Sequence, residues 1–478
     1  MRTFLLATAL LISICALSQN IGIGTETPLG KLHIKGSADT SQLVIDANTA
    51  QSNKSHPLIL LRKASGEELL RVHAATNSDV FIGYQAGLAT VGIIAPRNNT
   101  FIGSAAGLKN QLGTRNTAVG SGAFSGNDNG IQNVAIGYIS LTSNTSGSYN
   151  TAVGVQSLTA NTSGTQNTAL GYYSLYANST GYNNTAIGTA ALSTNTGISN
   201  TAVGVAAMQN NFTGSNNTSI GANALFNNSG ADASYNTAIG LAALYNTTNA
   251  QFNTALGHNA GSQFNNGYNN VFLGANTDVS GAGFFNVIAI GQSTVCTASS
   301  QVTIGNGATN AYRAYANWSN ISDGRFKKNI QENVPGLAFI TGLRPVTYNL
   351  KATELDNFLH PADNTLQRSD RIAAAPANES AKAAISKALK EKEQVTQTGF
   401  VAQEVEATAK KMGFNFSGID APANDKDVYG LRYAEFVVPL VKAVQELNSN
   451  QQEQIKVLNA TISNLQQQID ALKALIKK

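Results

Sequence analysis

Few residues of this chain have types and spacings that could carry out chemistry. The five histidines are scattered, and no Ser/His/Asp set, carboxylate pair, metal-ligand cluster or phosphate loop stands out, so neither a cofactor nor a metal is expected. Apart from Cys15, the only cysteine is Cys296, which we expect to be a small buried apolar side chain. The stretch Ser322–Ile330, Ser-Asp-Gly-Arg-Phe-Lys-Lys-Asn-Ile, places a hydroxyl beside an acid and several bases. A serine hydroxyl becomes a nucleophile only when a base removes its proton.

The N-terminal residues carry a pattern that is typical of exported proteins. Residues 1–18 have the pattern of a secretory signal peptide, with a positive charge at Arg2, an apolar run at Phe4–Ala16 and a small-residue cleavage site at Ala16-Leu17-Ser18. An N-terminal anchor helix is the alternative, but the run is shorter than the ~20 residues that a spanning helix needs. We therefore expect a protein that is secreted or held at the cell surface, with no membrane span.

Composition excludes further classes of function. Charged residues make up only 12% of the chain, and the formal net charge is +4. Because a nucleic-acid-binding surface needs clustered basic residues, no nucleic-acid partner is expected. With one cysteine left after signal cleavage, no internal disulfide can form.

A repeat dominates the middle of the chain. Residues 19–76 are expected to form an N-terminal β segment, and an array of Asn-Thr-Ala-aliphatic-Gly repeats runs over 77–305. Most copies start 17 residues apart, as at Asn133, Asn150 and Asn167. Full copies start at Asn116, Asn150, Asn167, Asn184, Asn200, Asn236 and Asn253, and variants at Asn99, Asn133, Asn217 and Asn270. Short extended pieces joined by Gly, Asn, Ser and Thr turns predict a stacked β-solenoid of roughly eleven rungs.

Two apolar positions recur in each copy, three and eight residues after the asparagine, as Val153 and Leu158 illustrate. A disordered Gly/Asn/Ser linker is the alternative, but a linker has no reason to keep an aliphatic residue at one phase. If both side chains were buried, they would contribute about 3–6 kcal/mol per rung. Ordering about 17 residues costs on the order of 17–34 kcal/mol of backbone entropy. We therefore expect several identical rods to pack side by side as an oligomer.

Charges and prolines return after the repeats. A linker at 306–321 is expected to lead into a small α+β domain at 322–450. Its predicted elements are a helix that ends before Pro345, a strand at Val346–Leu350 and a strand-to-helix unit that starts at Gly399. Residues 356–396 are interpreted as an insertion, a solvated arm with an exposed helix, and a binding element is the alternative.

The last residues, 451–478, carry a heptad pattern. Its apolar positions are Ile455, Leu458, Ile462, Leu465, Ile469, Leu472 and Ile476, with alternating spacings of three and four. This pattern predicts a short coiled coil, and Ile at a with Leu at d favours two strands in a parallel coil.

Two resemblances add to this interpretation. The repeats resemble the head repeats of trimeric autotransporter adhesins, which stack Asn-Ser-Val-Ala-Ile-Gly-type units into a parallel β-roll, although the copies here are longer. The opening Asn20–Pro28, Asn-Ile-Gly-Ile-Gly-Thr-Glu-Thr-Pro, is similar to the start of many secreted Bacteroidetes fibre proteins.

The C-terminal part resembles the intramolecular chaperone of phage tail spikes, also classed as the self-cleaving peptidase S74 family. The matching motifs are Ser-Asp-x-Arg-x-Lys-x-x-Ile at 322–330, Leu-Arg-Pro-Val at 343–346, Gly-Phe-Val-Ala-Gln-Glu-Val at 399–405 and Pro-Leu-Val-Lys-Ala-Val-Gln-Glu-Leu at 439–447. The resemblance implies a homotrimer, with Ser322 as nucleophile and Lys327 as general base for a cut at Ile321–Ser322. A lysine can act so only as the neutral amine, which requires desolvation or a nearby cation.

These observations predict a mostly β shaft, a trimeric β-roll or β-solenoid, followed by the chaperone domain and the coiled coil. The predicted function is that of a secreted surface fibre or adhesin, whose partners are its own copies and a surface glycan or host-surface ligand. The alternatives are a tail-spike-like enzyme and a phage-derived receptor-binding fibre. At most, catalysis would be one self-cleavage in cis, with no external substrate.

Overall fold

The computed structural model describes residues 21–23, 32–34, 59–63, 65–73, 78–90, 97–230, 232–315, 318–359 and 379–476. The predicted signal peptide lies outside these ranges, as do residues 35–58 and the middle of the predicted insertion. The chain divides into two compact units, Met1–Ser146 and Gly147–Lys478. No helix among the described residues is long and apolar enough to cross a membrane.

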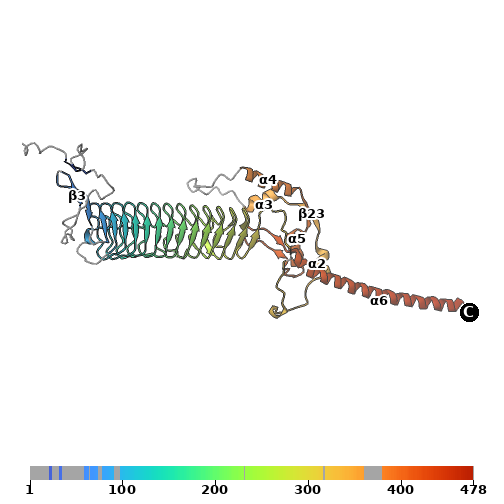
Figure 1. Cartoon of the computed structure of the whole chain (residues 1–478). Coiled ribbons are helices and arrows are strands. Elements are labelled where there is room, and N and C mark those ends of the chain that lie inside the picture. The colour runs from blue at the N-terminus through green and yellow to red at the C-terminus, as the bar shows by residue number, and fades with distance from the viewer. Residues whose placement is uncertain are drawn as a thin grey trace, which may run out of the picture. The chain divides into compact units, whose positions relative to one another are not determined.

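Residues 80–304 form a parallel β-solenoid of about 13 turns, a few more than the sequence pattern predicted. Within each unit, three-residue strands stack as successive parallel rungs, in register, so that each repeat lies on its neighbour (Figure 1). The first unit holds β5 (Val80–Ile82), β6 (Thr100–Ile102), β7 (Thr117–Val119) and β8 (Val134–Ile136). The second holds β9 (Thr151–Val153), β10 (Thr168–Leu170), β11 (Thr185–Ile187), β12 (Thr201–Val203), β13 (Thr218–Ile220), β14 (Thr237–Ile239), β16 (Thr254–Leu256), β18 (Val271–Leu273), β20 (Ile288–Ile290) and β22 (Val302–Ile304).

Other strands extend or flank this ladder. In the first unit, β3 (Ile59–Arg62) pairs antiparallel with β4 (Glu68–His73), and β4 extends the main sheet by pairing antiparallel with β5. The strands β1 (Ile21–Ile23) and β2 (Leu32–Ile34) pair in parallel as a separate sheet. In the second unit, two further parallel pairs stack on another side of the last turns. They are β15 (Asn249–Gln251) with β17 (Asn266–Tyr268), and β19 (Asp278–Val279) with β21 (Val295–Cys296).

The two recurring apolar positions have different environments. Leu158, eight residues after its asparagine, is fully buried, and its counterparts in the other regular copies are buried as well. The aliphatic residue at the third position faces outward, because side chains alternate along a strand and the central alanine, such as Ala169, points inward. Leu170 is 46% exposed. Within one chain only the eighth position is fully buried, and the interior is built from alanine, leucine and asparagine.

Asparagine side chains bind consecutive turns together inside the solenoid. Oδ1 of Asn150 accepts a hydrogen bond from the backbone N–H of Asn167 at 3.0 Å, and Oδ1 of Asn167 accepts one from Asn184 N–H at 3.0 Å. Nδ2 of Asn167 donates to the carbonyl of Gly181 at 2.8 Å. These side chains are fully buried and, with their hydrogen bonds made, their polar atoms do not carry the cost of an unpaired group.

The glycine that ends each repeat motif lets neighbouring turns approach closely. Gly171 has φ +142°, and a Cβ at this position would lie 2.5 Å from the carbonyl oxygen of Gly188 in the next turn. Any side chain would therefore clash with the following backbone.

A small helical module follows the solenoid. Its elements are η3 (Gly324–Phe326), α2 (Leu337–Gly342), β23 (Val346–Asn349), α3 (Ala352–Leu359), α4 (Glu379–Glu393), β24 (Thr396–Gly399), α5 (Ala402–Lys411), β25 (Ile419–Asp420), β26 (Gly430–Leu431), η4 (Tyr433–Phe436) and α6 (Val437–Ile476). β23 and β24 pair antiparallel. The buried cluster of the module joins Phe339, Val405, Ala409, Phe416 and Phe436. A strand lies at Val346–Asn349, close to the predicted Val346–Leu350. A strand-to-helix unit is also present, but its strand ends at Gly399, where the sequence-based expectation placed its start.

Helix α6 is one continuous helix of 40 residues, so the predicted boundary at residue 451 is not marked by a break. Its start packs on α2, where Leu337 N–H donates to Glu446 Oε2 at 2.7 Å. The apolar heptad positions beyond this contact are exposed, Leu458 by 59% and Ile462 by 54%.

The expectation of a solvated arm at 356–396 is wrong for its last turn. Most described residues of α4 are exposed, but Leu389 is buried, and Nζ of Lys392 donates to the carbonyls of Gly307 and Thr309, both at 3.0 Å. The end of α4 therefore contacts the segment that directly follows the solenoid.

Candidate functional site

The two residues predicted to form a catalytic pair lie within hydrogen-bond distance. Nζ of Lys327 donates to Oγ of Ser322 at 2.8 Å. The short helix η3 creates this contact, because its single turn folds the chain back over the intervening residues. Oδ1 of Asp323 caps the turn by accepting from Arg325 N–H at 2.9 Å, and Lys327 N–H donates to Gly324 O at 3.1 Å.

The charges beside the pair are partly engaged with each other. Arg325 and Asp323 form an ion pair at 2.6 Å, which lowers the pKa of Asp323 and raises that of Arg325. Since Arg325 is held by Asp323, its positive charge is largely offset where Lys327 lies. Lys328 forms no ion pair with an acid in the described part of the chain, so its charge is the nearby one that can favour the neutral form of Lys327.

The surroundings of the pair are open in a single chain. Ser322 and Lys327 are exposed, as are the large apolar side chains that flank them in sequence: Trp318 by 89%, Ile321 by 94% and Phe326 by 80%. A carbonyl that Ser322 could attack is supplied by Ile321, the preceding residue. The hydroxyl of Ser322 and the amine of Lys327 are in contact, but no described residue of this chain shields them from solvent.

The polar residues that join the module to the solenoid were not recognisable from the sequence patterns. They lie in the loop between β25 and β26 and at the end of α4: Asn424, Lys426, Asp427 and Lys392. The run Asn-Asp-Lys-Asp at 424–427 was the only available signal, and it is equally typical of a solvated turn.

Other sites have less definition. The described residues include no group of three His, Cys, Asp or Glu that could hold a metal ion. Burial raises the pKa of the Cys296 thiol, and its side chain is fully buried. A groove of about 560 Å³ in the module is lined by aromatic residues, among them Tyr348, Phe400 and Tyr433, without a charged cluster.

The fold defines the chain as a parallel β-solenoid protein with a helical C-terminal segment. No protein-family model matches the sequence, and no curated protein matches it significantly. The functional assignment below therefore depends on the motifs and geometry of this chain.

Proposed function

We propose that this chain is an exported surface fibre, adhesin-like and structural, which works as a homotrimer. In this proposal the C-terminal module directs assembly and cuts the chain once, at Ile321–Ser322. The shaft then presents its surface to a glycan or another ligand on a host or neighbouring cell.

One observation carries the proposal: an exposed aliphatic column follows the outer face of the main sheet. Its most exposed members are third residues of strands in the second unit, with exposures of 37–46% for Leu170, Ile187, Ile220, Leu256, Leu273 and Ile304. A regular apolar face of this kind on a monomer typically marks an interaction surface. From Asn116 to Asn270 only Asp128 and Asp232 are formally charged, so a second copy can approach without charge repulsion.

Exposed apolar residues after the solenoid support the same assembly. Tyr312, Tyr315, Trp318 and Ile321 recur every third residue and are 71–113% exposed. An extended chain with three residues per turn places such residues on one side. Three copies could bury these sides against each other, and the apolar seam of α6 would continue as a coiled coil. The heptad pattern alone favours two strands, and we choose three because of the family resemblance.

Assembly would also supply what the Ser322–Lys327 pair lacks. The neutral form of a lysine is favoured by desolvation, and the exposed Trp318, Ile321 and Phe326 are the side chains that packing copies would place around it. Neutral Lys327 takes the proton of Ser322, whose Oγ attacks the carbonyl carbon of Ile321. The Ile321–Ser322 C–N bond breaks, an ester forms, and the new amine receives the proton from Lys327. Water then hydrolyses the ester and leaves a carboxylate at Ile321.

The cleavage proposal is tested by intact mass of the mature protein under denaturing conditions, with native mass for the assembly. Wild type should give two fragments that meet at Ile321–Ser322, while Ser322→Ala and Lys327→Met stay full length and trimeric. Lys411→Met, at the exposed end of α5, is the control for loss of a lysine charge from the module and should cut like wild type. Full-length wild-type trimers would make the pair inert, and a cut that persists in Ser322→Ala would place the nucleophile elsewhere.

The assembly proposal has a separate test on the outer column. The double variant Leu170→Asp with Ile187→Asp should remain folded by circular dichroism but lose trimer mass, because each charge would be buried between shafts. Ser163→Asp, at an exposed turn, is the control for added charge and should keep the trimer. Trimers of unchanged stability in the double variant would mean that the column is not the interface.

A further inference from the structure

The module contacts the end of the solenoid through a polar loop. In the loop between β25 and β26, Nδ2 of Asn424 donates to the carbonyl of Thr297 at 2.7 Å, and Oδ1 of Asp427 accepts from the hydroxyl of Thr297 at 2.5 Å. Nζ of Lys426 donates to the carbonyl of Ser280 at 3.0 Å. Thr297 and Ser280 belong to the last turns, at the β19–β21 strand pair.

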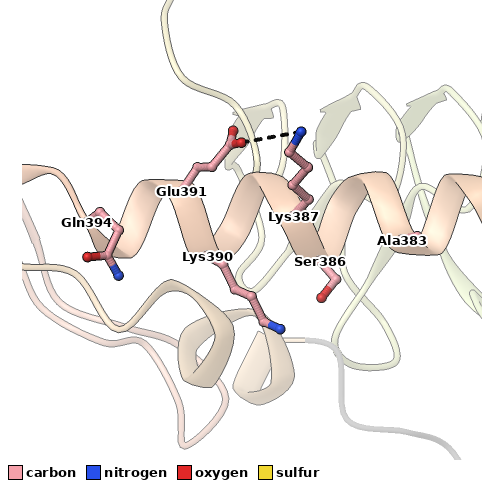
Figure 2. Close-up of a pocket in the computed structure, with 6 residues that line it drawn as sticks. All are labelled: Ala383, Ser386, Lys387, Lys390, Glu391 and Gln394. Atoms are coloured by element: carbon pink, nitrogen blue, oxygen red, sulfur yellow. Dashed lines mark ion pairs between the residues drawn. The ribbon is translucent and has the colours of Figure 1, made fainter.

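A second contact comes from the last turn of α4. Nζ of Lys392 donates to the carbonyls of Gly307 and Thr309, and Lys392 is itself half-buried. Leu389 on the same helix is only 4% exposed and lies so close that a Cβ on Gly307 would be 3.0 Å from its Cδ2. Figure 2 shows the neighbouring Lys387 of α4 directed instead to Glu391, with which it forms an ion pair at 3.7 Å.

All of these contacts cross the position of the proposed cut. Residues 280–309 stay with the shaft after a break at Ile321–Ser322, whereas Lys392 and the loop residues 424–427 belong to the C-terminal fragment. We propose that the module is not released by cleavage but remains bound to the shaft as a non-covalent cap, held by these two contacts, which we call the loop clamp (Asn424, Lys426 and Asp427) and the helix clamp (Leu389 and Lys392). The occurrence of a cut rests on the proposed function, but the clamps do not depend on it.

The chemistry of the clamps favours retention. Hydrogen bonds from an ammonium group to a carbonyl are charge-assisted and stronger than neutral ones. The acceptors are main-chain carbonyls of Ser280, Gly307 and Thr309, which adopt this spacing only when the last turns are folded. In a trimer each clamp would occur once per chain, so that dissociation requires all copies to open together. Salt screens the charge of an exposed lysine, and Lys426 is exposed. Higher salt should therefore weaken the binding of the module to the shaft at this contact.

The experiment separates the cut from the retention. A recognition sequence for a site-specific protease, inserted between Asn320 and Ile321 in the Ser322→Ala chain, allows the full-length trimer to be cut without self-cleavage. Denaturing mass gives the extent of cutting, and size-exclusion chromatography with light scattering shows whether the fragments elute together. The clamp variant is Lys392→Met with Lys426→Met. The control is Lys387→Met with Lys410→Met, which removes the same charge from the module without touching a clamp.

After cutting at the inserted site, the fragments of the chain with unchanged clamps (called wild type for the clamps) and those of the control should elute as one complex at low salt. The clamp variant should release its C-terminal fragment, with dissociation at least about tenfold faster for each lysine removed, because hydrogen bonds to charged groups contribute about 1.5–3 kcal/mol. Separate elution of the cut wild-type fragments at low salt would overturn the proposal, as would a clamp variant that holds its fragment like the control. Failure of wild type to cut itself would overturn only the cleavage proposal, because the inserted site reports retention independently.

Discussion

The asparagine ladder should dominate the stability of the solenoid, and Asn167→Ala tests this. The substitution removes the donor to Gly181 O at 2.8 Å and the donor to Asn150 Oδ1 at 3.2 Å. It also removes the acceptor of Asn184 N–H. Gly181 O keeps a second donor, Nδ2 of Asn178 at 3.0 Å, whereas the buried Asn184 N–H is left without its partner.

The expected cost follows from these contacts. Two lost hydrogen bonds contribute about 0.5–1.5 kcal/mol each, and the orphaned N–H costs about 1–3 kcal/mol. Together these terms predict that the free energy of unfolding falls by about 2–6 kcal/mol per chain, a large share of the ~5–15 kcal/mol that holds a typical domain folded.

The assay is urea unfolding followed by far-UV circular dichroism on the assembled protein at fixed concentration. Asn129→Ala is the matched control, because Asn129 is exposed at a turn and its backbone N–H, which donates to Thr145 O, is retained. The control should change stability by no more than about 0.5 kcal/mol. If Asn167→Ala unfolds at the same urea concentration as this control, the buried amides do not stabilise the stack, and the argument from the ladder is refuted.

Two other substitutions test the backbone within the solenoid and a charge at its last turns. Gly171→Ala should destabilise the protein by several kcal/mol or abolish its folding, because at φ +142° the added Cβ would lie 2.5 Å from Gly188 O. Gly324→Ala is the control: a Cβ there has nothing within 4 Å, so thermal unfolding should be unchanged. Burial raises the pKa of Asp278 to about 7, against hydrogen bonds from the N–H groups of Gln263 and Val279. Between about pH 4 and 7 the folded protein thus keeps a proton that the unfolded chain has released, so stability should fall as pH rises through this window, by at most about 4 kcal/mol. Asp278→Asn cannot ionise and should flatten the profile measured by urea unfolding at several pH values; an equally steep fall in the variant would assign the pH dependence to another group.

The sequence allowed the solenoid and its limits to be predicted, because the repeat places the same residue types at one phase copy after copy. It did not reveal the direction of the aliphatic third position. Leu170 and Leu158 look equivalent in composition, and only the alternation along a three-residue strand puts Ala169 inside and Leu170 outside. The Ser322–Lys327 contact was anticipated from a motif, since the residues are close in sequence. The clamps were not, because Thr297 and Asp427 are 130 positions apart and carry no periodic signal.

Copies of unequal length show how the ladder, rather than the spacing of the repeats, sets the register. The copy that starts at Asn184 is one residue short, yet Asn200 N–H still donates to Asn184 Oδ1 at 3.0 Å. The copy that starts at Asn217 is two residues longer than a regular copy, and Asn236 N–H still donates to Asn217 Oδ1 at 2.9 Å.

The difference in length is absorbed in one turn, after the second buried asparagine of each copy. The side-chain amide of that residue donates to a carbonyl three positions on in a regular copy (Asn178 to Gly181), two on in the short copy (Asn195 to Gly197) and five on in the long copy (Asn228 to Ala233). One hydrogen bond therefore closes turns of different length at the same place in the stack. Strands stay aligned because the amides on both sides of this turn keep their partners, and the loop between them is the part of the shaft that is free to vary in sequence.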